Sequence, residues 1–202
     1  MVTVGKDVAE VEARLVAGRL ECPCGGRLAP WGHARSRVLR DGTALGWSLR
    51  PRRARCSGCT RTHVLLPVGV LVHRADVVAV IGTALGLAAL GWGHRRVADR
   101  VGRAAGTVRG WLRRLRARAE ALRVEFTALL AALDPLAAMP DPTPSETGDV
   151  VAALLAATAA VTRRWAEAVE GLSPWDLAAA VTGGRLLAPS SGGESINTSW
   201  LW

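Results

Sequence analysis

The sequence has few aromatic residues, a single lysine and no apolar run long enough to cross a membrane. Aromatic residues make up 4% of its 202 residues, and Lys6 is the one lysine among 26 basic residues. The uncharged run Val77 to Trp92 has 16 residues, whereas a membrane-spanning helix needs about 20. Asp7, Glu10 and Glu12 interrupt what would be the apolar part of a secretory signal. We therefore expect a cytoplasmic protein with no membrane partner.

Positive charge is concentrated in the first part of the chain. The net charge is +9 and the pI is about 11.2, but arginine in place of lysine is also what a GC-rich genome produces. The distribution is more informative, because residues 1–123 carry a net +15 and residues 124–202 a net −6. A basic segment of this kind predicts a polyanionic partner. Half of the residues are hydrophobic, which is enough for a folded core and excludes a wholly disordered protein.

Four cysteines form two close pairs. Cys22 and Cys24 lie in ECPCGGRL, and Cys56 and Cys59 lie in RCSGCTRTH. Two short loops that each offer two thiolates supply the four soft ligands of a tetrahedral zinc ion, and disulfides are disfavoured in a reducing cytoplasm. The sequence therefore predicts a structural Zn²⁺ site at these four residues.

The first cysteine loop departs from the common pattern. CPCGG is one residue shorter than the usual CPxCG, so the loop offers fewer amide hydrogen bonds to sulfur. His33 or His63 is an alternative ligand in place of one thiolate, and a degenerate site with merely buried thiols is the remaining alternative.

The residues between and after the cysteine pairs alternate in the manner of short strands. Residues 37–40 and 47–50 flank an Asp41-Gly42 turn, and residues 63–66 form another strand closed by a proline. The order of cysteine loop, hairpin, cysteine loop and strand predicts a zinc ribbon over residues 20–72. So small and polar a unit would depend on its metal for much of its folding free energy.

The segment Gly93 to Leu115 has the spacing of a helix-turn-helix. Ala98 is followed by Gly102, Val108 and Trp111 at positions +4, +10 and +13. A small residue is needed where the helices cross, and a glycine accepts the positive φ of the tight turn. The apolar run before this segment is then the first helix of the motif.

The register places a second helix at 94–101 and a third from about residue 104. Arg109 is the candidate for reading a guanine edge, and its basic neighbours would contact phosphates. The candidate DNA-binding residues are Arg95, Arg96, Arg100, Arg103, Thr107, Arg109, Arg113, Arg114 and Arg116 on the helices, with Arg50, Arg52, Arg53 and Arg55 on the ribbon. An ordinary helical hairpin with a solvated arginine face is the alternative.

The third helix shows no stop signal, and a heptad stripe continues it to Leu133. The helix 108–133 would either form a homodimer or pack within the chain.

Residues 134–148 hold four of ten prolines and predict a linker. A C-terminal helical segment is expected at 149–187, with a helix opened by Ser173 and Pro174, and the tail 188–202 carries Trp200 and Trp202.

The first part of the chain resembles the N-terminal DNA-binding part of bacterial insertion-sequence transposases. The features that carry the resemblance are CPCGG, the arginine-rich hairpin, RCSGCTRTHVLLP and the helix-turn-helix. These features look most like those of actinobacterial zinc-ribbon plus helix-turn-helix proteins that are associated with insertion sequences. The similarity covers residues 20–118. The resemblance implies that the four cysteines bind zinc and that the helix near 104–116 reads DNA.

The expected fold is mainly α with a small N-terminal β zinc ribbon, a helix-turn-helix over 73–133 with an extended third helix, and C-terminal helices; residues 1–19 are expected to be helical. The expected function is sequence-selective binding of double-stranded DNA, as a transcriptional regulator or transposon-associated accessory factor, and the protein is accordingly expected to be nucleoid-associated. The alternative is a protein-interaction module that recruits a transposase or polymerase subunit. No enzyme and no small-molecule substrate are expected, since a transposase needs three carboxylates on a larger mixed fold than residues 124–202 allow.

Overall fold

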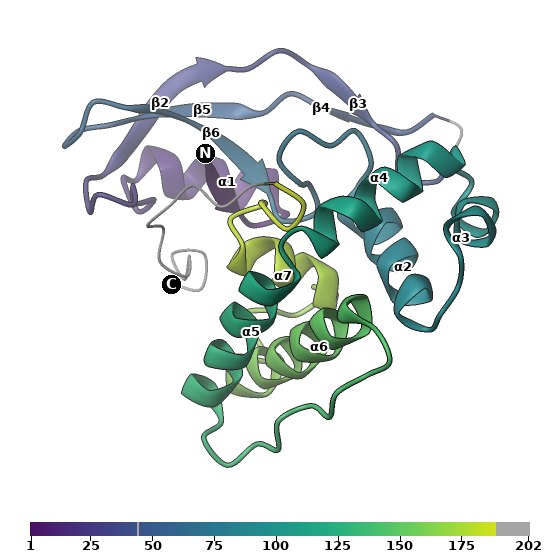
Figure 1. The fold of residues 1–202 in the computed structure, drawn as a ribbon. Coiled ribbons are helices and arrows are strands. Elements are labelled where there is room, and N and C mark those ends of the chain that lie inside the picture. The colour runs from purple at the N-terminus through teal and green to yellow at the C-terminus, as the bar shows by residue number, and fades with distance from the viewer. Residues whose placement is uncertain (44, 189–202) are drawn as a thin grey trace.

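The computed structural model describes residues 1–43 and 45–188, which divide into a half built on a β-sheet and a helical half (Figure 1). The strands are β1 (Val2–Val4), β2 (Leu28–His33), β3 (Arg37–Leu39), β4 (Trp47–Leu49), β5 (Arg52–Cys56) and β6 (Thr62–Pro67). The helices are α1 (Val8–Val16), α2 (Val78–Ala89), α3 (His94–Val101), α4 (Ala105–Arg116), α5 (Ala119–Leu133), α6 (Glu146–Arg164) and α7 (Pro174–Val181).

The main sheet has four strands in the order β1-β6-β5-β2, with β1 parallel to β6 and the other pairs antiparallel. Helix α1 packs on one face of this sheet. Asp7 begins the helix by accepting hydrogen bonds from the amides of Ala9 and Glu10, and Val11 and Leu15 are buried against the strands. Apolar residues that recur four apart on α1 therefore close the core of this half.

The expectation of a small zinc ribbon at 20–72 is wrong. The sheet is mixed, and its edge strand β1 comes from residues 2–4, within the segment 1–19 that was expected to be helical. The hairpin β3–β4 forms a separate two-stranded sheet whose Leu39 and Leu49 pack with Leu66. The parallel pairing of β1 with β6 joins segments about 60 residues apart, so local alternation could not reveal it.

The prediction of one extended third helix is also wrong, because α4 ends at Arg116 and a separate helix, α5, starts at Ala119. At the break, the amide of Arg118 donates to the carbonyl of Leu115, three residues back, at 2.9 Å. The Arg118 guanidinium donates to the carbonyl of Arg185. Tertiary hydrogen bonding therefore turns the chain at a point where no glycine or proline marks a stop.

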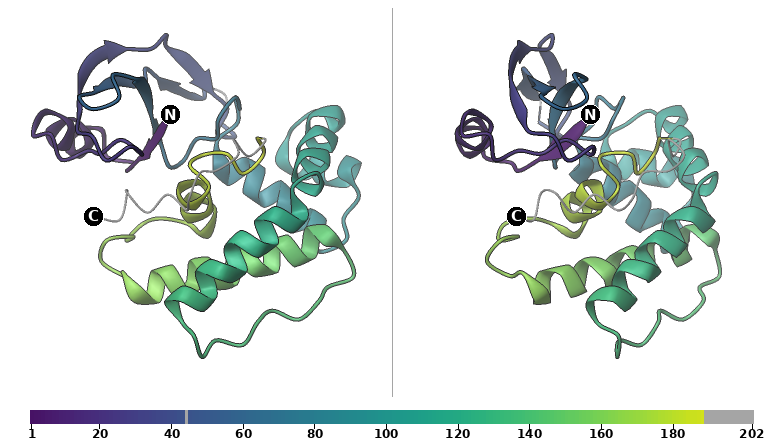
Figure 2. Two further views of the ribbon diagram at one scale, coloured as in Figure 1. Left: turned by 60° about the vertical axis from the view of Figure 1, so that its left-hand side comes forward. Right: turned by 90° about the vertical axis from the view of Figure 1, so that its left-hand side faces the viewer.

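The predicted heptad stripe is buried inside the chain. Leu122, Phe126 and Leu129 on α5 lie in one apolar cluster with Leu154 and Val161 of the neighbouring helix α6. Figures 1 and 2 show α5 and α6 side by side at the end of the molecule away from the sheet. A stripe covered by α6 offers no surface to a second copy, so the structure favours the packing alternative for this helix.

Helix α7 lies between the sheet and the α5–α6 pair (Figures 1 and 2). It begins as predicted at Ser173 and Pro174, with a capping box in which Ser173 and Asp176 exchange hydrogen bonds. Asp176 also accepts an ion pair from Lys6 at 2.8 Å, and Lys6 donates to the carbonyl of Gly171. The chain's one lysine thus ties the β1–α1 connection to α7.

None of the described helices is long and apolar enough to span a membrane. The uncharged run of the sequence forms α2, whose 12 residues bury Val78, Ile81 and Leu85 in the helical core. The tail residues Trp200 and Trp202 lie outside the described residues.

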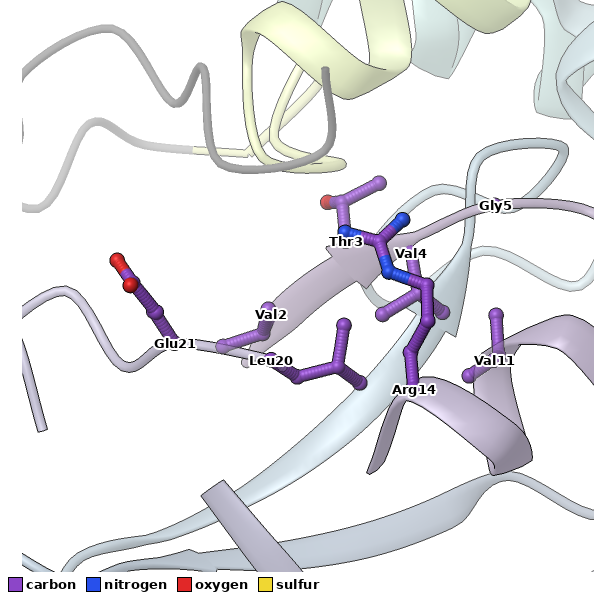
Figure 3. Close-up of a pocket in the computed structure, with 8 residues that line it drawn as sticks. All are labelled: Val2, Thr3, Val4, Gly5, Val11, Arg14, Leu20 and Glu21. Atoms are coloured by element: carbon purple, nitrogen blue, oxygen red, sulfur yellow. The ribbon is translucent and has the colours of Figure 1, made fainter. Parts of the chain in front are cut away.

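A small hollow between β1 and α1 has a volume of about 10 Å³ (Figure 3). Valine and leucine side chains line most of it, Arg14 rises from α1 toward Thr3, and Glu21 points away. A space of this size holds at most about one water molecule, so it is not a ligand site.

Candidate metal centre and basic helix face

The four cysteines converge at one end of the main sheet, as the spacing predicted. Their sulfur atoms all lie within 4.8 Å of one another, with Cys22 and Cys59 3.7 Å apart and Cys24 and Cys56 3.4 Å apart. In a tetrahedral site with metal–sulfur bonds of about 2.3 Å, sulfur atoms are roughly 3.8 Å apart. The cluster therefore has the donors and the spacing to hold a metal ion.

Backbone hydrogen bonds hold both cysteine loops in place. In the second loop the amides of Gly58 and Cys59 donate to the Cys56 sulfur at 3.3 and 3.4 Å. In the shortened first loop the amide of Cys22 donates to the carbonyl of Gly26 at 2.8 Å. A Cβ atom at Gly26 would come within 2.6 Å of the Cys56 sulfur, so only glycine lets the loops approach this closely.

Of the two alternative histidine ligands, one lies beside the cluster. The Nε2 atom of the buried His63 is 3.3 Å from the Cys22 sulfur, at hydrogen-bond distance. His33 ends β2 and does not belong to the group of converging ligand atoms. All four thiols are present in the cluster, so His63 can orient Cys22 without replacing a ligand.

The surroundings of the two thiols of the first loop differ. Burial raises the pKa of the Cys22 thiol to about 12. The backbone amide of Gly26, followed by the neighbouring thiols, lowers the pKa of the exposed Cys24 thiol to about 6. Before a metal binds, Cys24 is therefore the thiolate of this loop at neutral pH.

Immediately after a chelator strips the metal, while the sheet half is still folded, iodoacetamide is expected to modify Cys24 first, because the thiolate is the nucleophile. The rate should fall as the pH is lowered through about 6, and buried Cys22 should stay unmodified. Peptide mass spectrometry over a pH series measures both. Equal modification of Cys22 and Cys24, or a midpoint at the ordinary thiol value, would contradict the assignment, and restoring metal should protect Cys24.

Helix α3 has the bounds that the spacing predicted, and α4 begins one residue after its predicted start but ends at Arg116 instead of continuing to residue 133. Three residues join the helices, and Gly102 takes a left-handed conformation with φ of 62°. Ala98, Val108 and Trp111 are buried where the helices meet. The exposed side chains of this pair are therefore fixed in register by its core.

Most of the predicted DNA-binding arginines on the helices are exposed. Those that face solvent are Arg95, Arg96, Arg100, Arg109, Arg113 and Arg116. Thr107 and Arg114 are half-buried, and Arg114 donates to the carbonyl of Gly110 at 3.0 Å. These six exposed cations are the part of the prediction that a polyanion could contact.

Two of the predicted arginines have structural partners instead. Arg103 ion-pairs with Asp76 at 2.5 Å, and its side chain is only 13% exposed. Arg52 donates two hydrogen bonds of 2.9 Å to the carboxylate of Glu12 on α1. No local sequence pattern indicates these pairs, because each acid lies 27 or more residues away in the chain.

Sequence reasoning missed two residues beside the basic helices. Asp76 accepts hydrogen bonds from Arg40 as well as Arg103, and so anchors both the β3–β4 hairpin and the α3–α4 turn to the start of α2. Trp92 stacks under the Arg96 guanidinium, 3.7 Å from the ring centroid. Asp76 is the sole acid between Asp41 and Asp99, a pattern that could have drawn attention to it.

A surface hollow of about 360 Å³ lies between the start of α3 and one side of α4. Leu112 and Trp92 contribute its apolar lining. Its polar lining is cationic or imidazole: His94, Arg109, Arg113 and Arg116. The free amides at the start of α3 add positive potential, so the hollow suits an anionic group.

No family of known proteins, no curated protein and no solved structure was found to match the chain.

Proposed function

We propose that this chain binds double-stranded DNA with sequence selectivity, with α4 in the major groove and the cysteine cluster as a structural zinc site. The observation that supports this most is the cationic hollow between α3 and α4, where three arginines of α4 share one side of the helix. Helix α4 contains no acidic residue, so nothing on it offsets that charge. The proposal includes no catalysed reaction.

The arginines of the hollow have different roles in this proposal. Arg109 is nearest the start of α4, the end that enters the groove in helix-turn-helix proteins, and its guanidinium can bond one guanine through two hydrogen bonds. Arg113 and Arg116 lie one and two turns further on, beside His94, where a backbone phosphate fits. Arg103 and Arg52 are excluded from these contacts because Asp76 and Glu12 hold them.

The proposed metal is zinc because of the donor set. Four thiolates in tetrahedral spacing favour Zn²⁺ or an iron–sulfur centre, and a closed set of four ligands is typical of structural zinc. Zinc bound there would hold the two cysteine loops together and leave no ligand position open for chemistry.

The proposal is tested with duplexes that the wild-type protein selects from a random library. Arg109→Ala is expected to weaken binding about 10- to 100-fold and to relax selection at one base pair. Arg113→Ala should weaken binding to all duplexes by a similar factor. Arg123→Ala is the matched control, because Arg123 is an exposed arginine of α5 that pairs with Glu120.

Fluorescence anisotropy gives the affinities. If Arg109→Ala and Arg113→Ala bind as Arg123→Ala does, α4 is not the reading helix. If no duplex is selected at all, the alternative of a protein-recruiting module is favoured.

A further inference from the structure

The main sheet has one covered and one open face. On β5, Arg52, Ala54 and Cys56 face the side covered by α1, where Arg52 pairs with Glu12 and the other two are buried. Side chains alternate along a strand, so Arg53 and Arg55 lie on the opposite face. These two arginines were predicted DNA contacts that the α3–α4 surface does not use.

An exposed tryptophan lies on this open face beside the arginines. Trp31 on β2 is 51% exposed, and the Arg55 guanidinium carbon is 4.8 Å from its ring centroid. The pairing of β2 with β5 shifts between Pro30 and His33, so that Trp31 and Gly32 together stand opposite Arg53. Such a bulge redirects side chains, and here it places the Trp31 ring beside Arg55 and opposite the backbone position of Arg53.

The side chains of these strands favour a negatively charged partner that has unpaired aromatic bases. β2, β5 and β6 contain no Asp or Glu, and the acid that contacts β5, Glu12, lies on the covered side. An exposed ring offers its face to one unpaired base, whereas duplex bases are already stacked on each other. Aromatic rings flanked by arginines are the usual means by which proteins hold single strands.

We propose that the open face of the sheet binds single-stranded nucleic acid, with one base stacked on Trp31 and the adjoining phosphates held by Arg53 and Arg55. This surface is separate from α4, and the proposal does not depend on the duplex-binding function. A protein with both surfaces would contact a duplex through its helices and an unpaired strand through its sheet.

The test measures binding of a labelled oligo(dT) strand to the full-length protein by fluorescence anisotropy. Trp31→Ala is expected to weaken binding about 5- to 100-fold, the effect of losing one stacked base. Trp31→Phe should keep most of the affinity, because phenylalanine retains a stacking face. Arg53→Ala should weaken binding as well, whereas Val38→Ala, an exposed apolar residue of the separate hairpin, should not.

Two further measurements keep the result specific. Metal content and circular dichroism of the Trp31 variants should equal those of the wild type, since the ring is half exposed and not part of the core. Duplex binding should be unchanged by Trp31→Ala and weakened by Arg109→Ala, with the opposite pattern for oligo(dT), so either surface can fail alone. The proposal is overturned if the wild-type protein does not bind oligo(dT), if Trp31→Ala binds it normally, or if Trp31→Phe is as weak as Trp31→Ala.

Discussion

Cys56→Ser is expected to abolish stable metal binding and to unfold the sheet half of the protein. The Cys56 sulfur is buried, accepts two backbone hydrogen bonds and lies 3.4 Å from the Cys24 sulfur of the first loop. Structural zinc sites contribute roughly 10–16 kcal/mol in small metal-folded domains at neutral pH, which exceeds the whole stability of many domains. The apolar cluster under α1 consists of few large side chains and cannot replace that contribution.

The measurements are zinc content by atomic emission and limited proteolysis. Wild-type protein should carry about one equivalent of zinc, and the variant far less; its digestion should begin within the sheet half and spare the helices longest. Ser57→Ala is the control, since Ser57 is exposed and next to Cys56 but outside the cluster. A Cys56→Ser protein with full metal content and normal protease resistance would show that metal binding at these cysteines does not stabilise the fold.

Asp76→Ala is expected to lower the free energy of unfolding by about 3–5 kcal/mol, the usual cost of removing one partner of a buried ion pair. The Asp76 side chain is 3% exposed and accepts hydrogen bonds from Arg40 and from Arg103. Without it, the charge of the mostly buried Arg103 has no partner, and both the hairpin and the α3–α4 turn lose their anchor. Thermal unfolding should show a decrease in Tm of roughly 6–20 °C.

A matched control is available in Asp134→Ala, because the Asp134–Arg163 pair is more exposed and such pairs contribute about 1 kcal/mol or less. A second substitution, Arg103→Leu, should recover part of the stability lost in Asp76→Ala by removing the unpaired charge. Equal unfolding of the Asp76 and Asp134 variants would show that the buried carboxylate does not anchor these elements.

The sequence predicted the features that depend on local backbone chemistry. Gly102 marks the turn between α3 and α4, Ser173 and Pro174 mark the start of α7, and the Asp41-Gly42 turn marks the β3–β4 hairpin. Each of these signals acts within a few residues, so spacing alone places it. The convergence of the cysteines was predictable for a chemical reason, since two pairs of thiolates supply the four ligands of one metal ion.

The features that were missed depend on distant parts of the chain. Strand β1 has only three residues, and its partner β6 follows some 60 residues later. The break before α5 depends on a hydrogen bond from Arg118 to Arg185, and the removal of Arg103 from the candidate DNA surface depends on Asp76. Arginines look alike in a sequence, and only tertiary contacts separate those that hold the fold from those that face solvent.

That separation limits how strongly salt can weaken binding of duplex DNA. Each phosphate that a cation neutralises releases bound counterions, which makes the logarithm of affinity fall against the logarithm of salt with a slope of about −0.9 per phosphate. The exposed cations of the helix pair are Arg95, Arg96, Arg100, Arg109, Arg113 and Arg116. Since Asp76 withholds Arg103, this surface alone supports a slope no steeper than about −5. A steeper slope would mean that a duplex also reaches arginines of the sheet half.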